Sequence, residues 1–471
     1  MSSTSADLRA MEQGILGDIW TSNESYETLR ELVDDIGHRF GGSESERKGA
    51  EFLKRKMESY GLQNVRIESF PLASWERGQA TLKLTAPVEL SVSCISLPYC
   101  PSADITAELL HVGDGEKDDF ERLGDAVRGT VVISAAETNR PGERGSHRTD
   151  KYNWAVEYGA VGYVYINQNP GQLRITGSIP GNNRDDKSAK GREAPIPAVG
   201  ISYESGSKIL RLLERGAGKV ELKTTDRTFD STSYNVVGEI VGSEHPNQVV
   251  LFGGHFDGHD ISEAAGDDGA GAITGLEAAR ALAQFKGQLK RTARVICFGS
   301  EELGLNGAWH HAANNDPDDF VFVMNLDGAG RGAGGQEQLN LSGWPDLVTY
   351  FSEWGKENHY TFNVRDQLNS HSDHFPFAVR GIPNGTLNAR DTSSGMVGRG
   401  WGHTEADTLD KLSLRGLQMS AILVARLILT ICQDDDFPAS RRSEDEVRQQ
   451  LDDAGLLARL EAAGNFPPKQ A

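Results

Sequence analysis

The segment QVVLFGGHFDGHDISEAAGDDGAGAITGLEAARALA, residues 248–283, contains the elements of an α/β fold in their simplest order. Residues 248–253 form a short apolar run, which is typical of a buried strand. Glycine-rich turns with histidine and aspartate follow, and the alanine-rich stretch 269–283 predicts a helix. In α/β proteins, catalytic and ligand-binding residues commonly lie beyond the carboxyl ends of such strands. The segment therefore predicts an α/β domain whose functional site lies at its strand ends.

The same alternation of strands and helices continues on both sides of this segment. Strands are predicted at 65–70, 235–241, 294–298 and 320–326, and helices within 25–62 and at 307–314 and 412–433. Alternation of this kind predicts a mixed, mostly parallel sheet that is flanked by helices on both faces.

Residues 75–228 differ in character from the sequence around them. Short β-rich runs alternate there with glycine and proline turns and charged loops. Because the α/β pattern resumes afterwards, we expect an inserted β-rich domain. The predicted domains are a catalytic domain (1–74 plus 229–440), the insert (75–228) and a charged C-terminal helix and tail (441–471). The helix, predicted at 443–463, is expected to dock on the body of the protein, with a homodimer contact as the alternative.

Charge and composition narrow the range of partners. The 471 residues include 48 basic and 68 acidic side chains, a formal net charge of −20. Nucleic acids and anionic membranes require a basic surface, so the sequence argues against both. No apolar run approaches the length of a membrane span, and residues 1–20 lack the apolar stretch of a secretory signal. We therefore expect a cytoplasmic protein, whose four cysteines are free thiols.

Histidine and acidic residues follow the predicted strands one after another. The candidate metal ligands are His255, Asp267, Glu302, Asp327 and His403. Two hydrolytic metal ions need one bridging carboxylate and further nitrogen and oxygen ligands on each side. The simplest division gives each ion one histidine and one terminal carboxylate, with Asp267 as the bridge. His255 and Asp327 then hold one ion, and Glu302 and His403 hold the other.

Two further acidic residues have predicted catalytic roles. Asp257 lies two positions after His255, on the same side of an extended chain, where it can accept the second ring N–H of the histidine. Glu301 directly precedes the ligand Glu302 and is the candidate general base, which takes a proton from water and delivers it to the leaving amine.

This series resembles the co-catalytic zinc exopeptidase family, which includes bacterial leucyl aminopeptidases, glutamate carboxypeptidase and carboxypeptidase Q. The family pattern is H-x-D, then D-[DNP]-x-[SAG]-G, then E-E, then D after a strand, then a late H followed by D-T. The matching residues here are His255 and Asp257, 267–271 (DDGAG), Glu301 and Glu302, Asp327, and His403 with Asp407 and Thr408. The insert is similar to a protease-associated domain at 129–133 (GTVVI), 159–162 (GAVG) and 196–201 (IPAVGI), and 75–78 (WERG) is similar to the carboxypeptidase Q subgroup.

The resemblance implies a peptidase with two zinc ions, although cobalt or manganese suits the same geometry. One departure concerns the oxyanion: many relatives carry a tyrosine directly before the last histidine ligand, where this chain has Gly402. An oxyanion donor must then come from Asn388, Arg390, a backbone N–H or the metals alone. His374, within a Ser-Asp-His segment, is a further candidate for substrate contact, whereas His259 and His371 are interpreted as loop histidines.

We expect a metallo-exopeptidase that removes N-terminal residues from peptides or cleaves dipeptides. Carboxypeptidase action is an alternative, because loop arginines could bind a substrate carboxylate; these are Arg331, Arg365, Arg390 and Arg399. A non-catalytic receptor or scaffold and a single-metal acyltransferase are two further hypotheses. The complete set of ligands argues against both.

Overall fold

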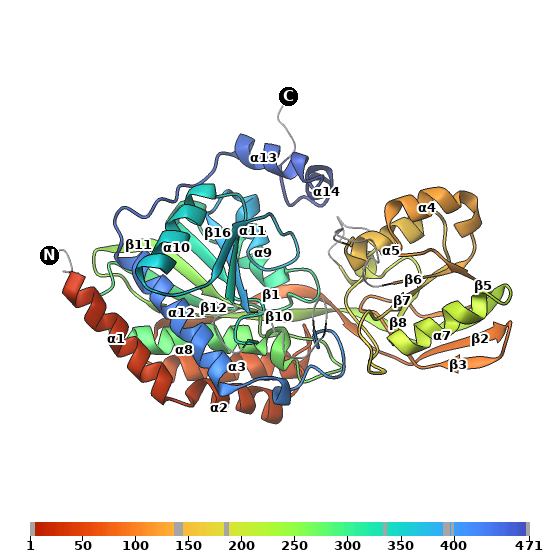
Figure 1. The fold of residues 1–471 in the computed structure, drawn as a ribbon, viewed down its shortest axis with the longest axis horizontal. Helices are drawn as coiled ribbons and strands as arrows, with labels where there is room; N and C mark the ends of the chain where they lie inside the picture. Colours follow the sequence, from red (N-terminus) through yellow and green to blue (C-terminus); the bar gives the residue numbers. More distant parts are fainter. Residues whose placement is uncertain are drawn as a thin grey trace. The chain divides into compact units, whose positions relative to one another are not determined.

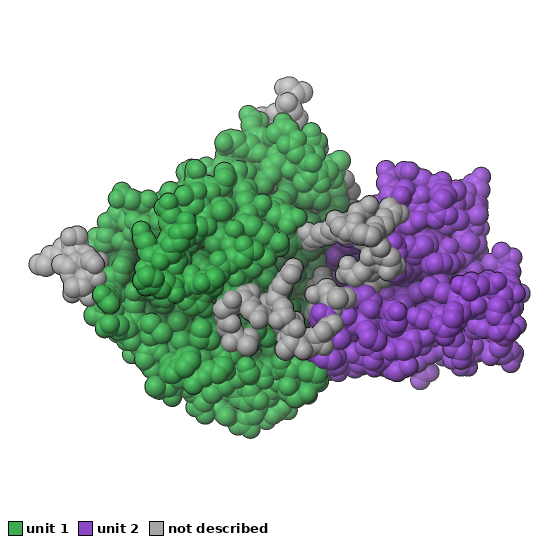
Figure 2. Space-filling model, viewed as in Figure 1, with its two compact units in different colours: residues 1–70, 232–393, 407–471 green, residues 71–231, 394–406 purple. Residues whose placement is uncertain are grey.

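The computed structural model describes residues 5–135, 145–182, 188–332, 337–389, 396 and 400–467. These residues form two compact units (Figure 2). Unit 1 comprises Met1–Phe70, Thr232–Ser393 and Asp407–Ala471, and unit 2 comprises Pro71–Ser231 and Ser394–Ala406. The chain leaves unit 1 within strand β1 (Gln63–Glu76) and returns to it within strand β10 (Arg227–Ile240).

Unit 1 is built around a mixed sheet in the order β1-β10-β12-β11-β13-β16-β14-β15 (Figure 1). The other strands are β11 (His245–Gly253), β12 (Arg291–Cys297), β13 (Phe320–Asn325), β14 (Glu337–Leu341), β15 (Asn363–Asp366) and β16 (Asn384–Ala389). Strand β11 is parallel to both β12 and β13, and β13 is parallel to β16. Strand β12 is antiparallel to β10, and β16 is antiparallel to β14.

Helices cover both faces of this sheet, because alternate strand residues fill two separate cores. Val250 and Phe252 of β11 point into the core beneath the helices α1, α2, α3, α8 and α12. Val249 and Leu251 point to the opposite core, against α9 and α11. The helices of unit 1 are α1 (Ser5–Thr21), α2 (Glu24–Arg30), α3 (Glu44–Ser59), α8 (Ala270–Ala283), α9 (Asn306–Ala313), α10 (Pro345–Glu357), α11 (Phe375–Val379), α12 (Leu414–Gln433), α13 (Glu444–Asp453) and α14 (Leu457–Ala462), with short helical turns η1 (Glu31–Ile36), η3 (Ala265–Gly269), η4 (Pro317–Asp319) and η5 (Leu409–Lys411). The predicted α/β class is confirmed.

Helix α12 is the one stretch among the described residues that is long and apolar enough to cross a membrane. It has 20 residues, so the prediction that no apolar run approaches the length of a membrane span is wrong. However, 78% of the apolar window is buried within the fold, and the helix packs against α8 and α1. Length and hydropathy describe a central core helix equally well.

The charged C-terminal segment forms two helices, α13 and α14, where one continuous helix was predicted. Gly455, with φ +68°, follows α13 and reverses the chain, as glycine commonly does after a helix C-terminus. Leu451 and Leu460 from these helices pack with Leu305 and Phe375, which follow the strand-end segments at 301–302 and 372–374. The segment is therefore docked on unit 1.

Unit 2 contains its own eight-stranded sheet, in the order β3-β2-β9-β5-β6-β7-β8-β4. Its strands are β2 (Ala80–Ala86), β3 (Leu90–Val92), β4 (Cys94–Ser96), β5 (Ala103–His111), β6 (Val131–Ala135), β7 (Gly162–Ile166), β8 (Ala198–Ile201) and β9 (Gly218–Thr224), and its helices are α4 (Lys117–Leu123), η2 (Gly124–Val127), α5 (Arg148–Glu157), α6 (Ala189–Arg192) and α7 (Tyr203–Leu213). All four cysteines of the chain, Cys94, Cys100, Cys297 and Cys432, are buried free thiols.

Candidate active site

Three adjacent parallel strands bring the predicted ligands of unit 1 to one edge of the sheet. His255 follows β11, Glu301 and Glu302 follow β12, and Asp327 follows β13. Because β11 lies between its two parallel neighbours, the carboxyl ends of all three strands meet at the same edge. A bridge between His255 and Phe298 continues the pairing just beyond the strands.

The side chains of His255, Glu301 and Asp327 form one cluster, in which potential ligand atoms all lie within 4.8 Å of one another. His255 is 1% exposed, and its Nε2 lies 4.0 Å from Oε2 of Glu301 and 3.6 Å from Oδ1 of Asp267. Burial disfavours the protonated ring, but the nearby carboxylates, with Glu301 foremost, outweigh burial and raise the pKa of His255 well above its usual value. The cluster therefore favours positive charge at the histidine position.

Asp257 joins the loop after β11 to the loop after β12. Its backbone oxygen and its Oδ1 lie 3.1 Å and 3.5 Å from Nδ1 of His255. The same carboxylate accepts the backbone N–H of Glu301 at 3.0 Å and that of Glu302 at 3.2 Å. One fully buried side chain thus fixes the turn that carries both glutamates and lies beside the histidine ring. Its role in orienting that ring stays a prediction.

Asp267, the predicted bridging ligand, lies in a turn whose backbone is hydrogen-bonded to the side chain of Asp407. The carboxylate of Asp407 accepts the N–H groups of Gly266 at 2.7 Å and Asp267 at 3.0 Å. Arg331 donates from Nε to the carbonyl of Gly266, and its Nη2 lies 3.0 Å from Oδ1 of Asp267. A guanidinium is therefore in direct contact with the carboxylate that we predict to join two ions. The bridging role of Asp267 stays a prediction.

The neighbouring Asp268 is completely buried and supports the same turn from inside the protein. Its Oδ1 accepts the N–H of Gly271, at the start of α8, and that of Gly328, which directly follows Asp327. A Cβ atom at Gly254 or Gly271 would collide with the Asp268 carboxylate, so both positions require glycine. Burial raises the pKa of Asp268 well above its usual value.

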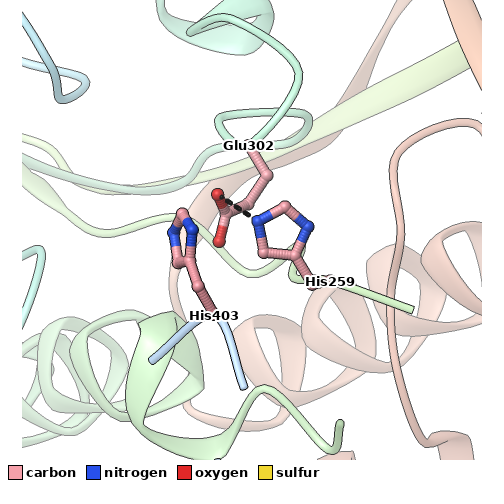
Figure 3. A group of neighbouring side chains, drawn as sticks. All are labelled: His259, Glu302 and His403. Carbon is pink, nitrogen blue, oxygen red and sulfur yellow. Dashed lines mark ion pairs between the residues drawn. The ribbon is translucent and has the colours of Figure 1, made fainter. Parts of the chain in front are cut away.

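A second group of potential ligands includes His259 and Glu302, and Figure 3 shows the imidazole directed at the carboxylate. Nε2 of His259 lies 3.0 Å from Oε2 of Glu302, and the two residues are 2% and 6% exposed. The sequence-based interpretation of His259 as a plain loop histidine missed this proximity. The available signal was the period-two spacing in His255-x-Asp257-x-His259, which places three polar side chains on one side of an extended segment.

His403, which Figure 3 also labels, belongs to unit 2 and is 4% exposed. Its Nδ1 lies 3.1 Å from the backbone oxygen of Thr176, while its own backbone oxygen accepts the N–H of Thr176 at 2.9 Å. The chain enters unit 1 again at Asp407, four residues later. Since consecutive Cα atoms are about 3.8 Å apart, the Cα of His403 lies within about 15 Å of that of Asp407. Its predicted role as a ligand stays a prediction.

The Ser-Asp-His segment, residues 372–374, contacts Asp327 and the end of strand β13. Ser372 donates to Oδ2 of Asp327 at 2.7 Å and accepts a hydrogen bond from Asn325 at 2.6 Å, which fixes the Asp327 carboxylate. Asp373 is completely buried, and neither of its oxygens has a hydrogen-bond partner among the residues that the structure describes. Burial, assisted by nearby carboxylates, raises the pKa of Asp373 well above its usual value.

The three predicted substrate contacts have different positions. His374 is completely buried, Nδ1 lies 2.8 Å from the hydroxyl of Thr386, and burial lowers its pKa to about 4. This position favours a structural role, so a substrate contact through His374 stays a prediction. Asn388 is half-buried on β16 beside Gly328, near the strand-end edge. Arg390 lies outside the described residues.

The side chains at this edge suit zinc. They offer imidazole nitrogens and carboxylate oxygens without cysteine, the donor set of catalytic zinc sites that keep a position open for substrate. Glu301, Glu302, Asp327 and Asp373 are close enough for their charges to affect one another. Several buried or half-buried carboxylates in one place are costly unless a cation compensates them. A bound divalent ion would supply that compensation.

Histidine and carboxylate side chains at the parallel strand ends of an α/β sheet are an arrangement typical of metal-dependent hydrolases. Residues 235–428 match the model of peptidase family M28, and residues 97–209 match that of the PA domain. Residues 235–428 are thus similar to peptidase family M28 and residues 97–209 to PA domains, as the motifs predicted.

Individual relatives agree with this assignment. Carboxypeptidase Q from Bos taurus is 30% identical over 319 residues, which are 65% of this chain and 64% of that protein. The chain thus spans less than two thirds of the length of that curated relative. A peptidase M28 precursor from Shewanella amazonensis has a similar structure, with a TM-score of 0.77 at 23% identity over 93% of this chain and 98% of that one. A zinc aminopeptidase from Bacillus subtilis gives a TM-score of 0.65 at 23% identity, over 89% and 97%. These structures show the same fold.

Proposed function

We propose that this protein is an exopeptidase with two zinc ions, which removes N-terminal residues from peptides or cleaves dipeptides. The observation that carries the proposal is the convergence of His255, Glu301 and Asp327 within 4.8 Å at the ends of three adjacent parallel strands. Glu302 follows in the same loop as Glu301, so ligands for a second ion are available next to the first. Matched relatives include proteins named carboxypeptidase Q and zinc aminopeptidase.

In the proposed centre, His255 and Asp327 bind one ion, Glu302 and His403 bind the other, and Asp267 joins them. Zinc, when bound, polarises the scissile carbonyl and lowers the pKa of water at the site towards about 7. The support for the His403 assignment is the sequence pattern, together with the short connection from His403 to Asp407, which holds the Asp267 turn. Cobalt or manganese can replace zinc in such a donor set.

Residues of the chain carry the proton transfers. Glu301 accepts the proton of the attacking water and returns it to the leaving amine. Its backbone is fixed by the hydrogen bond to Asp257, and its Oε2 lies 4.0 Å from His255. Asp257 holds the His255 ring, so the base and the ligand keep a constant relative position. The proposed mechanism needs the base Glu301 and the ligand His255 at a fixed separation, and the Asp257 carboxylate contacts both.

Carboxypeptidase action is the second candidate, and Arg331 is the observation that favours it. A carboxypeptidase requires a cation for the substrate carboxylate, and Arg331 contacts Asp267 directly with 22% of its side chain exposed. Of the other candidate arginines, Arg365 lies on β15, while Arg390 and Arg399 fall outside the described residues. A receptor or scaffold role is disfavoured because Glu301 and its neighbouring ligands are all present.

The test is a panel of aminoacyl p-nitroanilides, free dipeptides and N-blocked peptides, assayed with zinc, after chelation and after zinc is restored. We expect cleavage of unblocked substrates that chelation abolishes and zinc restores. Release of C-terminal residues from N-blocked peptides would replace the aminopeptidase proposal by the carboxypeptidase one. Activity that survives complete removal of metal would contradict both.

A further inference from the structure

We propose that His259 is an additional metal ligand, which binds the ion on the Glu302 side of the site and makes that position rich in nitrogen and selective for zinc. The inference rests on the two-ion centre proposed above. The motif of the family supplies two histidines, His255 and His403, and does not include this third one.

The distance between the two side chains fits a shared ion. Nε2 of His259 and Oε2 of Glu302 are 3.0 Å apart. Two ligand atoms that each lie about 2.0–2.1 Å from a tetrahedral zinc ion are roughly 3.3 Å apart. The observed separation differs by only a few tenths of an ångström, so a small movement of either side chain admits the ion. Both residues are almost fully buried, so the ion would have little competition from bulk water.

The loop that carries His259 is fixed in place by the fully buried Arg39. The Arg39 guanidinium donates to the carbonyls of Phe256 at 2.5 Å, Glu263 at 2.8 Å and Ala264 at 2.8 Å. Its own carbonyl accepts the N–H of Gly258, directly before His259, at 3.4 Å. Burial lowers the pKa of Arg39 to about 10, which still leaves it charged at neutral pH. A loop braced on both sides of His259 holds the imidazole ready for an ion.

The spacing of the two histidines divides them between two groups of side chains. Nε2 of His255 lies near Glu301 and Asp267, whereas Nε2 of His259, four residues later, lies near Glu302. One loop thus supplies an imidazole to each group. The competing interpretation is an imidazole that only donates a hydrogen bond to Glu302 and orients it. In that case the ring nitrogen would not be bonded to the ion, which a spectroscopic count of ligands can distinguish.

An additional imidazole has a chemical consequence for the choice of metal. Imidazole suits zinc, whereas sites made of carboxylates and water suit manganese and magnesium. With His259 and His403 both on the Glu302 side, that position would prefer zinc over manganese more strongly than the His255 side does. Removal of His259 should therefore weaken zinc binding more than manganese binding.

The experiment compares wild-type protein with His259→Ala and His259→Gln. Each protein is freed of metal by chelation and titrated calorimetrically with zinc and then with manganese, and zinc K-edge absorption counts the imidazoles on the bound ions. We expect the variants to bind one zinc ion at least about 10- to 100-fold more weakly, since even outer partners of ligands have effects of this size. The count of imidazoles should fall from three, namely His255, His259 and His403, to two.

The matched control is His245→Ala, because the side chain of His245 is 42% exposed on β11, far along the strand from the site. It should bind zinc like the wild type. Thermal melting of the metal-free proteins checks that the His259 variants are folded. Unchanged zinc affinity and an unchanged count of imidazoles in folded His259→Ala would overturn the proposal, however many ions the wild type binds. A wild type that binds a single ion would instead contradict the two-ion function, and then loss of that ion in the variant would still support His259.

Discussion

Glu301 is proposed to transfer protons without being a metal ligand, so its substitution should affect catalysis and leave metal binding unchanged. We expect Glu301→Gln to keep its zinc stoichiometry and to lower kcat by roughly 10²- to 10⁴-fold, because the amide cannot take a proton from water. The Asp257 contact uses the backbone N–H of Glu301 and survives the substitution. Steady-state kinetics together with metal analysis checks this prediction. Glu58→Gln, at an exposed glutamate of α3, is the control, and near-normal turnover of Glu301→Gln would remove Glu301 from its role.

Asp407 acts through the backbone, since its carboxylate accepts two N–H groups from the Asp267 turn. Asp407→Asn replaces one carboxylate oxygen by an NH₂ group, which cannot accept a hydrogen bond, so one of these two backbone N–H groups loses its partner. We expect zinc affinity to fall by about 10- to 100-fold, the usual effect of a residue that supports a ligand. Calorimetric titration measures it, with Asp410→Asn as control because Asp410 is exposed three residues away. Equal affinities in the two variants would show that the turn holds its shape without Asp407.

At the scale of elements, the C-terminal helices α13 and α14 pack against the segments that carry the site. Leu451 is 2% exposed and lies in a cluster with Leu305 and Phe375, just beyond Glu302 and His374. Leu451→Ala removes buried methyl groups, so the free energy of unfolding should fall by about 2–5 kcal/mol. Denaturant unfolding measures the change, and Gln449→Ala, on the exposed side of α13, should change it little. A fall in zinc affinity beside the loss of stability would show that this packing also supports the site.

The sequence predicts the helices and strands of unit 1 well where apolar residues form one clear pattern along the element. Residues 248–253 are predicted as a strand because both faces of β11 are buried, and α8 follows because its alanines favour a helix. The leucine spacing of the C-terminal segment continues across Gly455 and predicts one helix, whereas Gly455 adopts a positive φ and ends α13. Helix α1 is absent from the predicted elements, although Met11, Ile15 and Ile19, spaced four residues apart, form its buried stripe.

At the scale of the whole molecule, the predictable part of the site is the part that follows strands. His255, Glu301, Glu302 and Asp327 are recognised because each comes directly after a buried run, and parallel strands bring such ends together. The period-two spacing of His255, Asp257 and His259 indicates which way His259 faces, but its contact with Glu302 joins two loops that are distant in sequence, so the spacing does not identify the partner. The brace of Arg39 on that loop is equally non-local, since it depends on how α3 and its preceding turn pack against the sheet.

Stability of the metal-free protein should depend on pH in a direction set by its buried acids. Burial raises the pKa of Asp268 and of Glu46 well above their usual values, and nearby carboxylates raise that of His255. Each group therefore binds more protons in the folded than in the unfolded chain at pH values between its two pKa values. Stability then falls as pH rises through this range, by the linkage between proton binding and folding.

Histidines with lowered pKa values act in the opposite direction at lower pH. The pKa of His374 is lowered to about 4 by burial, so the unfolded chain binds more protons than the folded one between about pH 6.5 and pH 4. Stability contributed by neutral His374 is lost as pH falls through that window. Between about pH 4 and pH 6.5 this contribution opposes that of Asp268 and Glu46, whereas above about pH 6.5 the raised pKa of His255 acts without such opposition. The melting temperature of the chelated protein should therefore decline as pH rises from about 6.5.

Zinc should reverse the alkaline decline, because its ligands bind in their deprotonated forms and metal binding releases protons. Melting the chelated and the zinc-saturated protein at pH 6, 7 and 8 tests this expectation. The difference in melting temperature between the two forms should grow as pH rises, since protons compete less with zinc while the unpaired carboxylates cost more. A difference that is constant across this range would mean that the raised pKa values at the site do not control its stability. A difference that shrinks with rising pH would contradict the binding of zinc to deprotonated carboxylates and neutral imidazoles.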